Sequence, residues 1–356
     1  MKKPVSLLMP VLNEEQSAAI TLDSVFRSTR LPDEIIIADG GSTDNTIPIV
    51  ESYRDKGVKI TIVENPGVFA GAGRNEAFAE CTGDILVLLD FGNIISEDWI
   101  ELTAKPFEEI DDLDFIGSIY QPIVKSDFQH CVAAVIYFLN SRVSKMNIEE
   151  IIPMIPETPE PPGALGLAVS REMWQRCGGM PGWLRAAEDK LFGRKMMLLN
   201  PTYHFVPEVR MGHHMRETPG DIFKQMLVYY RGHARTHYKI KEFLKILLIY
   251  LVAAALLFAL PWSIQTFTLL LLLALAYLWR TGLIKVVQID RGLKKWSYIP
   301  MTFVIVIARD LGCIAGYLLG LKDWIFDPVY RNNYTKYMEI GDSKPPALDE
   351  IDSKMS

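Results

Sequence analysis

The feature that most restricts the fold is an unbroken apolar run at residues 85–89, Ile-Leu-Val-Leu-Leu. It has the length of one strand and is flanked by Gly83 before it and Asp90 after it. A strand that is apolar on both faces is typical of the middle of a parallel sheet that helices cover on both sides. Ligands bind at the carboxyl ends of such strands, so Asp90 is expected to face a crevice. A turn residue that caps the next element is equally compatible with this stretch.

Strand and helix patterns alternate through the first 100 residues. Apolar runs at 5–10, 34–39 and 58–63 predict strands, and helical spacing separates them. A glycine-rich loop at 67–74 and a helix at 74–81 then lead into the central strand. This order is typical of an α/β fold with a mixed, mostly parallel sheet and helices on both faces.

Polar side chains follow three of the predicted strands, and we therefore expect a binding site along one edge of the sheet. These residues are Asn13 and Glu14, Asp39, and Asp90.

The composition narrows the class of protein. The formal net charge is −6 and the pI is about 5.6, which argues against a nucleic-acid-binding protein with a clustered basic surface. The four cysteines have no spacing typical of a zinc site or a disulfide framework. The first residues are too short for a secretory signal and run into strand-like sequence, so we expect this part of the chain to stay in the cytosol.

The motifs at the strand ends, taken together and in order, resemble those of the family 2 glycosyltransferases, which have the GT-A fold. The motifs are Pro10-Val11-Leu12-Asn13-Glu14, Asp39-Gly40-Gly41-Ser42-Thr43-Asp44-Asn45-Thr46, Gly73-Arg74-Asn75, and the strand that ends at Asp90. The resemblance extends over roughly residues 5–238. It implies an enzyme that uses a UDP- or GDP-sugar as donor.

The resemblance also implies roles for these residues on the donor. Asp39 and the first loop, with Pro10, Asn13 and Glu14, would hold the nucleotide base and ribose. Arg74 would lie near the base and the diphosphate. The chemistry agrees, because ribose hydroxyls need hydrogen-bond acceptors and a diphosphate needs positive charge.

In the family, the residue that matches Asp90 opens a D-x-D motif that holds a divalent cation on the diphosphate. Mg²⁺ and Mn²⁺ prefer oxygen ligands, as this role requires. This chain has Gly92 where the family usually has a second acidic residue. Asp90 could act alone with diphosphate oxygens and water, or with Asn93 or with His213 or His214.

The second half of the catalytic region contains a predicted strand at 163–169 and a predicted helix at 171–177. Between the two halves, the spacing at 128–143 predicts a helix that packs in the core or contacts the acceptor. The proline-rich segment 153–162 is expected to be loop, and could form a lid.

The Glu188-Asp189 pair resembles the acidic pair that opens a helix in the second half of the family's domain. Inverting transfer needs a general base for the acceptor hydroxyl, and the resemblance assigns this role to Asp189. Glu188 would orient Asp189 or bind acceptor. Two carboxylates that are stabilised by the dipole at a helix N-terminus are the structural alternative.

A basic amphipathic segment at 223–235 is followed by further lysines at 239–245. The segment resembles a region that closes over the diphosphate in processive members of the family, although the spacing from Gln225 to Arg231 differs. The resemblance makes Arg231 the candidate for stabilising the charge on the leaving diphosphate. Anionic lipid headgroups explain the lysines equally well.

Long apolar runs begin at residue 243. The runs 243–262 and 264–279 are long enough to form a hairpin of two membrane spans. Basic residues flank both ends and place those ends in the cytosol. A third apolar segment, 298–321, carries Arg309-Asp310. It favours a third span, with an interfacial or re-entrant helix as the alternative.

The predicted organisation is therefore a cytosolic GT-A domain at 1–240, membrane helices at 241–321 and a polar tail at 322–356. Within the first domain, residues 1–100 would bind the nucleotide-sugar and 101–240 the acceptor. The expected protein is a multi-pass membrane enzyme that transfers sugar to a hydroxyl of a lipid-linked or polysaccharide acceptor. The alternatives are a polyprenyl-phosphate sugar synthase and a non-catalytic sugar-nucleotide sensor.

Overall fold

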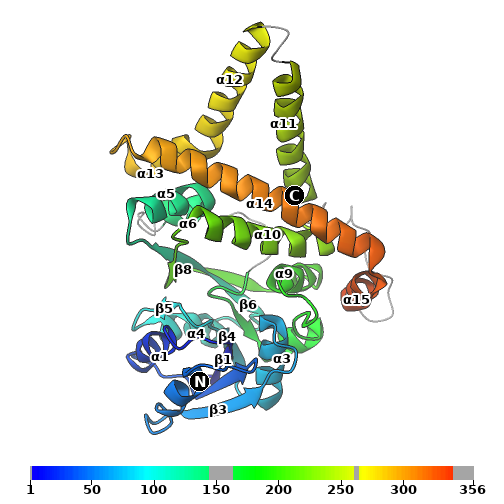
Figure 1. Ribbon diagram of the computed structural model, residues 1–356. Coiled ribbons are helices and arrows are strands. Elements are labelled where there is room, and N and C mark those ends of the chain that lie inside the picture. Colours follow the sequence, from blue (N-terminus) through cyan, green and yellow to red (C-terminus); the bar gives the residue numbers. More distant parts are fainter. Residues whose placement is uncertain (1, 144–162, 260–263, 340–356) are drawn as a thin grey trace. The chain divides into compact units, whose positions relative to one another are not determined.

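The computed structural model describes residues 2–143, 163–259 and 264–339. These residues form two compact units, shown in Figure 1. The first unit contains residues 1–121, 143–214 and 333–356, and the second contains 122–142 and 215–332. This division differs from the boundary predicted at residue 240, because segments on either side of that boundary pack together in the second unit. The predicted lid at 153–162 lies outside the described residues.

One sheet organises the first unit, with strand order β3-β2-β1-β4-β7-β6-β8-β5. The strands are β1 (Val5–Val11), β2 (Glu34–Asp39), β3 (Lys59–Glu64), β4 (Ile85–Leu88), β5 (Ile94–Ile95), β6 (Phe115–Ile123), β7 (Ala168–Ser170) and β8 (Tyr203–His214). Strands β1 to β4 pair in parallel, whereas β7 pairs antiparallel with both β4 and β6. The mixed, mostly parallel sheet that the sequence predicts is confirmed.

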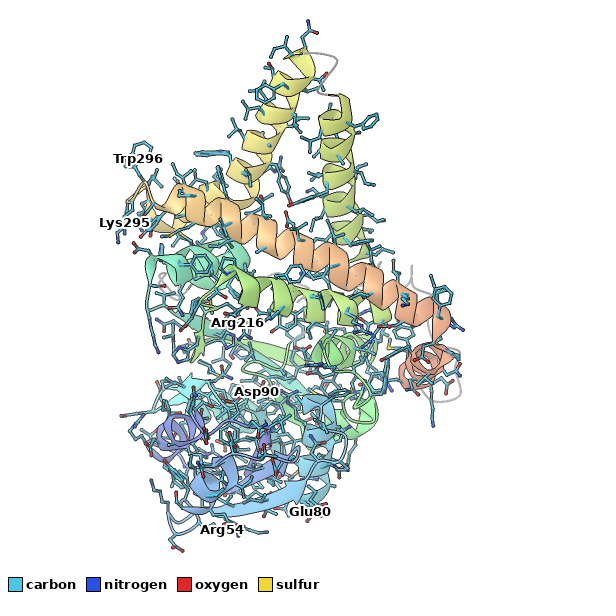
Figure 2. All side chains as sticks on the ribbon, in the orientation of Figure 1. Arg54, Glu80, Asp90, Arg216, Lys295 and Trp296 are labelled. Carbon is cyan, nitrogen blue, oxygen red and sulfur yellow. The ribbon has the colours of Figure 1, made fainter. Side chains whose placement is uncertain are left out.

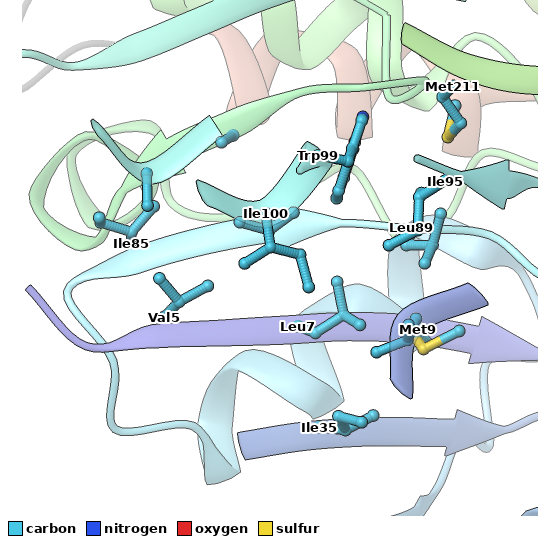
Figure 3. Packing of buried hydrophobic residues seen from close by; sticks show 14 of the residues in the cluster. Val5, Leu7, Met9, Ile35, Ile85, Leu89, Ile95, Trp99, Ile100 and Met211 are labelled. Carbon is cyan, nitrogen blue, oxygen red and sulfur yellow. The ribbon is translucent and has the colours of Figure 1, made fainter. Parts of the chain in front are cut away.

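The central strands are buried on both faces, as the apolar run at 85–89 predicts. Alternate residues of β1 enter different cores: Leu7 and Met9 belong to one cluster, and Leu8 to the other. Figure 3 shows Leu7 and Met9 packed in the first of these cores together with Ile100. This arrangement follows from the two-residue period of a strand.

Helices supply the remainder of both cores. The first core contains residues of α1 (Ala18–Phe26), α2 (Thr46–Glu51) and α4 (Trp99–Glu109). The second contains residues of α3 (Ala70–Glu80), α8 (Arg171–Cys177) and α9 (Glu188–Leu198). The sheet is thus fixed from both sides, which gives a rigid support for the loops at its carboxyl edge.

Two local predictions differ from the structure. The glycine-rich segment predicted as a loop up to residue 74 becomes helical at Ala70, where α3 begins. The strand predicted at 163–169 is shorter and begins at Ala168. In the first case the glycines have a packing role, because a Cβ at Gly73 would lie 2.8 Å from Nδ2 of Asn65. Composition alone does not distinguish such a helix from a loop.

The second unit is helical and has its own core. Its helices are α5 (Asp127–Ile136), α6 (Phe138–Val143), α10 (Pro219–Arg235), α11 (Ile240–Ala259), α12 (Ile264–Leu278), α13 (Ile284–Asp290) and α14 (Tyr298–Phe326), and a π-helical turn, η3 (Trp279–Leu283), joins α12 to α13. Figure 1 shows α11 and α12 side by side as a hairpin that projects from the layer formed by α10 and α14. The last helix, α15 (Pro328–Met338), begins in this unit and ends in the first.

The segment predicted at 298–321 is one unbroken helix that extends to Phe326, into the predicted tail. Its small residues recur every fourth position and face the backbone of α10. A Cβ at Gly316 would lie 2.3 Å from the carbonyl oxygen of Leu227, and one at Gly320 would lie 2.4 Å from that of Arg231. The glycine stripe therefore lets the two helices approach closely.

Asp310, in the middle of α14, is completely buried, but its carboxylate is well supplied with donors. It accepts hydrogen bonds from Arg309 at 2.8 Å, from the hydroxyl of Tyr277 at 2.7 Å and from that of Tyr250 at 3.3 Å. These contacts tie α11 and α12 to α14. A buried charge with such partners avoids most of the cost of an unpaired one.

Candidate active site

The carboxyl ends of β1, β2 and β4 lie at the same edge of the sheet. Val11 is paired in register with Asp39, and Leu8 with Leu88. Asp39 and Asp90 therefore flank the end of β1, as predicted for parallel neighbours. Figure 2 shows Asp90 at the end of β4.

Hydrogen bonds join the first two loops. Asn13 has a φ of 54°. Its backbone amide donates to the Ser42 hydroxyl at 3.0 Å, and its side-chain oxygen accepts from the backbone amide of Thr43 at 2.8 Å. Asp39 accepts from the amide and the hydroxyl of Ser42, at 2.9 and 2.7 Å. Asn13 and Asp39 are thus fixed in one small network. Glu14 adds a further contact, because its amide donates to the Thr46 hydroxyl at 2.7 Å.

Arg74 is the centre of the site. Its side chain is 1% exposed, and its guanidinium bridges two carboxylates that are far apart in the sequence. The Nη2 atom lies 2.5 Å from Oδ1 of Asp90, and Nη1 lies 3.4 Å from Oε1 of Glu188. The structure therefore brings together three of the predicted site residues.

Gly71 and Gly73, in the first turns of α3, allow this approach because they lack side chains. A Cβ at Gly71 would lie 3.0 Å from Cγ of Glu188, and one at Gly73 would lie 3.1 Å from Cβ of Pro10. Pro10 thus contacts the helix that carries Arg74. The Gly-Ala-Gly-Arg segment therefore packs closely between the end of β1 and the start of α9.

Glu188 and Asp189 open α9. The preceding residue, Ala187, has a φ of 65°, an uncommon conformation for a residue with a Cβ, and such strain is concentrated at functional sites. Oδ2 of Asp189 accepts from the Ala164 amide at 3.1 Å, and Oδ1 accepts from the Lys190 amide at 2.8 Å. These donors fix the orientation of the Asp189 carboxylate.

Glu188 is more deeply placed than Asp189, and its side chain is 12% exposed. Burial, together with the negative charge of Asp189, raises the pKa of Glu188 above its ordinary value, and the Arg74 guanidinium opposes this shift. The two adjacent carboxyl groups therefore have different environments. Such a difference is the usual way in which neighbouring carboxyl groups acquire different tasks.

The loop after Asp90 brings one of the predicted histidines into the site. Asn93 is 2% exposed, and its side-chain nitrogen Nδ2 donates to the backbone carbonyl of Asp90 at 3.0 Å. Its Oδ1 atom lies 2.9 Å from Nδ1 of His213, across the pairing of β5 with β8. Because the oxygen of Asn93 accepts, Nδ1 of His213 is the donor in this contact. Neighbouring strand residues point to opposite faces, which separates His214 from this contact.

No group of three or more His, Cys, Asp or Glu side chains in the described residues is placed to hold a metal ion. Near β4, Asp90 offers one carboxylate to a cation: its side chain is 36% exposed, and its Oδ1 atom pairs with Arg74. The metal roles of Asp90, His213 and His214 stay predictions.

Arg231 lies on α10, in the second unit, where it is engaged by Asp323 of α14. Its Nε and Nη2 atoms lie 2.7 and 3.0 Å from the two oxygens of that carboxylate. Asp323 also accepts from Arg235, at 2.6 Å. The role of Arg231 at the leaving diphosphate stays a prediction.

Sequence reasoning missed one residue that holds the site together. The side chain of Asn75 clamps the backbone of Met180, accepting from its amide at 2.8 Å and donating to its carbonyl at 2.7 Å. Asn75 thereby links α3 to the segment that leads into Glu188 and Asp189. The signal was its place beside Arg74 in the Gly73-Arg74-Asn75 motif, but no sequence pattern identified its partner.

The chain matches two protein-family models. The model described as glycosyl transferase family 2 matches residues 6–153, and the model described as glycosyl transferase family group 2 matches residues 85–308. Similar curated proteins include glycosyltransferase GlyG of Streptococcus pneumoniae, with 28% identity over 34% of this chain and 40% of that protein. They also include the poly(ribitol-phosphate) beta-N-acetylglucosaminyltransferase TarS of Staphylococcus aureus, with 24% identity over 62% of this chain and 39% of that protein. The chain thus spans less than half the length of either relative.

Among solved structures, the mannosyltransferase PcManGT of Pyrobaculum calidifontis, in complex with GDP-Man and Mn²⁺, has a TM-score of 0.53 with this chain. It is 16% identical, and the match covers 92% of this chain and 88% of that one. At this identity the likeness concerns the fold, which agrees with the mixed sheet covered by helices on both faces. The second family model matches well over half of the chain, so the chain belongs to the family 2 glycosyltransferases and has their GT-A fold.

Proposed function

We propose that the protein is an inverting glycosyltransferase that moves a sugar from a nucleotide-diphosphate sugar to a hydroxyl of a lipid-linked or polysaccharide acceptor at the cytosolic face of a membrane. The observation that carries this proposal is the buried Arg74, which joins Asp90 on the donor side to Glu188 on the acceptor side. A guanidinium that pairs with both carboxylates fixes the position of the donor side relative to the acceptor side. Transfer between two substrates needs both of them to be held in a fixed relative position.

The donor lies along the carboxyl edge of the sheet in this proposal. Asp39, Pro10 at the end of β1, and the loop that carries Asn13 and Glu14 hold the base and the ribose. The network that Asn13 and Asp39 share with Ser42 supports this placement. Arg74, which is 1% exposed, holds the Asp90 carboxylate at this edge.

The transfer step is a single displacement at the anomeric carbon. The acceptor oxygen forms a bond to that carbon while the bond to the diphosphate oxygen breaks, and the diphosphate leaves with the electron pair. Asp189 takes the proton of the acceptor hydroxyl on the opposite face. The amides of Ala164 and Lys190 orient its carboxylate for this task. Configuration at the anomeric carbon inverts as a consequence.

Glu188 has a different role, because burial favours its protonated form. In that form it leaves Asp189 as the charged member of the pair and donates or accepts hydrogen bonds at the acceptor. Its contact with Arg74 fixes the start of α9.

A divalent cation, Mg²⁺ or Mn²⁺, would be held by Asp90 together with diphosphate oxygens, and His213 is the better placed of the two histidines to add a nitrogen ligand. When bound, such a cation neutralises charge on the leaving diphosphate. The contribution of the chain is to hold these side chains in place. Asn93 does so by fixing both the Asp90 loop and the ring of His213.

The hairpin of α11 and α12 is the part that we propose to insert into the membrane. Among the described residues, two helical stretches are long and apolar enough to cross a bilayer, Ile264–Asp290 and Tyr298–Phe326. The helix α12 has no buried side chain along its described length, and α11 exposes large side chains such as Leu248 and Phe258. A helix that is apolar on all sides needs an apolar solvent.

The helix α14 is proposed to lie along the membrane surface. It packs through Gly312, Gly316 and Gly320 onto α10, which carries Lys224, Arg231 and Arg235. These charges make a position of α10 in the bilayer core costly, and α14 is held to α10 along its length. Figure 2 shows Lys295 and Trp296 at the turn that precedes α14, a pair typical of a membrane interface.

The proposal is tested with the full chain in detergent or liposomes, by measuring release of nucleotide diphosphate from a panel of UDP- and GDP-sugars with membrane lipid extract as the source of acceptor. We expect release with one class of donor that stops when EDTA is added. Tight nucleotide binding without release, with every donor and with extract present, would instead support a sugar-nucleotide sensor.

A further inference from the structure

Tyr337, near the end of α15, contacts the segment before the Glu188-Asp189 pair and the helix after it. We propose that Tyr337 is a positioning residue for these two carboxylates, an inference that rests on the proposed function for its catalytic consequence. The residues between it and the carboxylates are the turn Gly178-Gly179-Met180 and Lys195 of α9. All of them belong to the first compact unit.

The two contacts of Tyr337 bracket the acidic pair. Its hydroxyl donates to the carbonyl of Gly179 at 2.8 Å. Its own backbone carbonyl accepts from Nζ of Lys195, and this nitrogen also lies 4.6 Å from the centre of the Tyr337 ring. Lys195 follows Glu188 by about two helical turns, and therefore lies on a similar face of α9. One residue thus fixes the chain on both sides of the carboxylates.

The turn that Tyr337 holds has little freedom to adjust. Gly178 and Gly179 have φ values of 72° and 74°, and a Cβ at Gly179 would lie 2.6 Å from Oδ1 of Asn75. The next residue, Met180, is held by both polar atoms of the Asn75 side chain. A shift of Gly179 would therefore pass to Asn75 and to the neighbouring Arg74.

These contacts form a closed circuit. Tyr337 donates to Gly179, and the next residue, Met180, donates to Asn75. Arg74, which precedes Asn75, pairs with Glu188 at the start of α9. Lys195, further along α9, donates to the carbonyl of Tyr337. Each link joins a different pair of segments. Loss of one link leaves the elements in place but removes a constraint on the start of α9.

The end of α15 is anchored well enough to act as a support. Met338 is completely buried, and Tyr334 is 8% exposed. Lys195 is also buried, so its ammonium group depends on the carbonyl and ring of Tyr337. Burial raises the pKa of the Tyr337 phenol well above its ordinary value, and the hydroxyl therefore stays a donor.

Tyr337 lies in the helix that directly follows α14 in the chain. The chain leaves α14 at Phe326, enters α15 at Pro328 and reaches Tyr337 within the same helix. The residue that supports the acidic pair is therefore covalently continuous with the helix proposed to lie on the membrane.

The test compares Tyr337→Phe in the full-length protein with the wild type and with Tyr330→Phe. The control removes a phenol hydroxyl from the same helix, where the ring packs on Arg235. Amide hydrogen exchange is followed at residues 178–190, and kcat and donor KM are measured in parallel. We expect faster exchange at 178–190 and a kcat about 10-fold lower at unchanged KM in Tyr337→Phe alone.

Unchanged exchange at 178–190 would overturn the proposal. A lower Tm with unchanged kcat would do so as well, since that result describes a residue that only stabilises the fold. If the wild type releases no nucleotide from any donor, the proposed function fails, and the exchange measurement still decides whether Tyr337 holds the acidic pair.

Discussion

The guanidinium of Arg74 lies within 2.5 Å of the Asp90 carboxylate while it also contacts Glu188, so that one buried cation joins the end of β4 to the start of α9. The two carboxylates belong to segments that the sequence separates by about 100 residues. Their shared partner is the feature of the site from which most consequences follow.

Replacement of Arg74 should affect stability as well as activity. In Arg74→Met, Asp90 and Glu188 lose the guanidinium that they share, and we expect destabilisation of about 1–3 kcal/mol. Arg74→Lys keeps the charge, but one ammonium cannot bridge both carboxylates in the same geometry, so a smaller loss is expected. Denaturant unfolding of the full chain measures both. Equal stability of Arg74→Met and wild type would contradict the bridging role.

The buried Glu188 should make stability depend on pH. Its pKa is higher in the folded than in the unfolded state, because burial and Asp189 disfavour the charged form despite Arg74. The associated stability is fully present below the unfolded pKa of about 4.3 and is lost as the pH rises through the folded value. We expect the Tm of wild type to fall relative to that of Glu188→Gln between about pH 5 and pH 8. A difference in Tm between the two proteins that does not change with pH would contradict a raised pKa of Glu188.

The two histidines of β8 should behave differently towards metal. His213 contacts Asn93 in the Asp90 loop, whereas strand geometry directs His214 to the other face. In His213→Gln the Mn²⁺ concentration that gives half-maximal turnover should rise by about 10- to 100-fold. His214→Gln is the matched control and should resemble wild type. Identical titrations for the two variants would exclude His213 as a ligand.

The contact between α10 and α14 should tolerate no side chain at Gly316. A Cβ there would lie 2.3 Å from the Leu227 carbonyl oxygen, so Gly316→Val must separate the helices. We expect a loss of about 1–3 kcal/mol, read as a lower Tm of the full chain in detergent. Leu318→Val, on the exposed side of α14, serves as the control and should leave the Tm unchanged. A tolerated Gly316→Val would refute the close approach.

Local patterns predicted the sheet well because the signals are themselves local. The apolar runs at β1, β2 and β4 required burial on both faces, and the polar residues at their ends then had to share one edge. The start of α3 was wrong because glycines usually interrupt helices, whereas Gly71 and Gly73 are needed here for close packing.

Contacts between distant segments were not predictable in the same way. The pairing of Arg74 with Glu188 joins residues 114 positions apart, and no periodicity relates them. The same holds for the pairing of Arg231 with Asp323 and for the contact of Tyr337 with Gly179. The family resemblance singled out Arg74 and Glu188 individually, but only the fold places them together.

The measurement that tests the central claim most directly compares wild type with Asp189→Asn in the presence of donor, divalent cation and acceptor. Sugar transfer and donor affinity are followed separately. We predict that transfer falls by about 10²- to 10⁴-fold while donor affinity stays within about twofold, because only the general base is lost. Transfer that persists in Asp189→Asn would contradict the account and favour an acceptor that is already anionic, such as a polyprenyl phosphate.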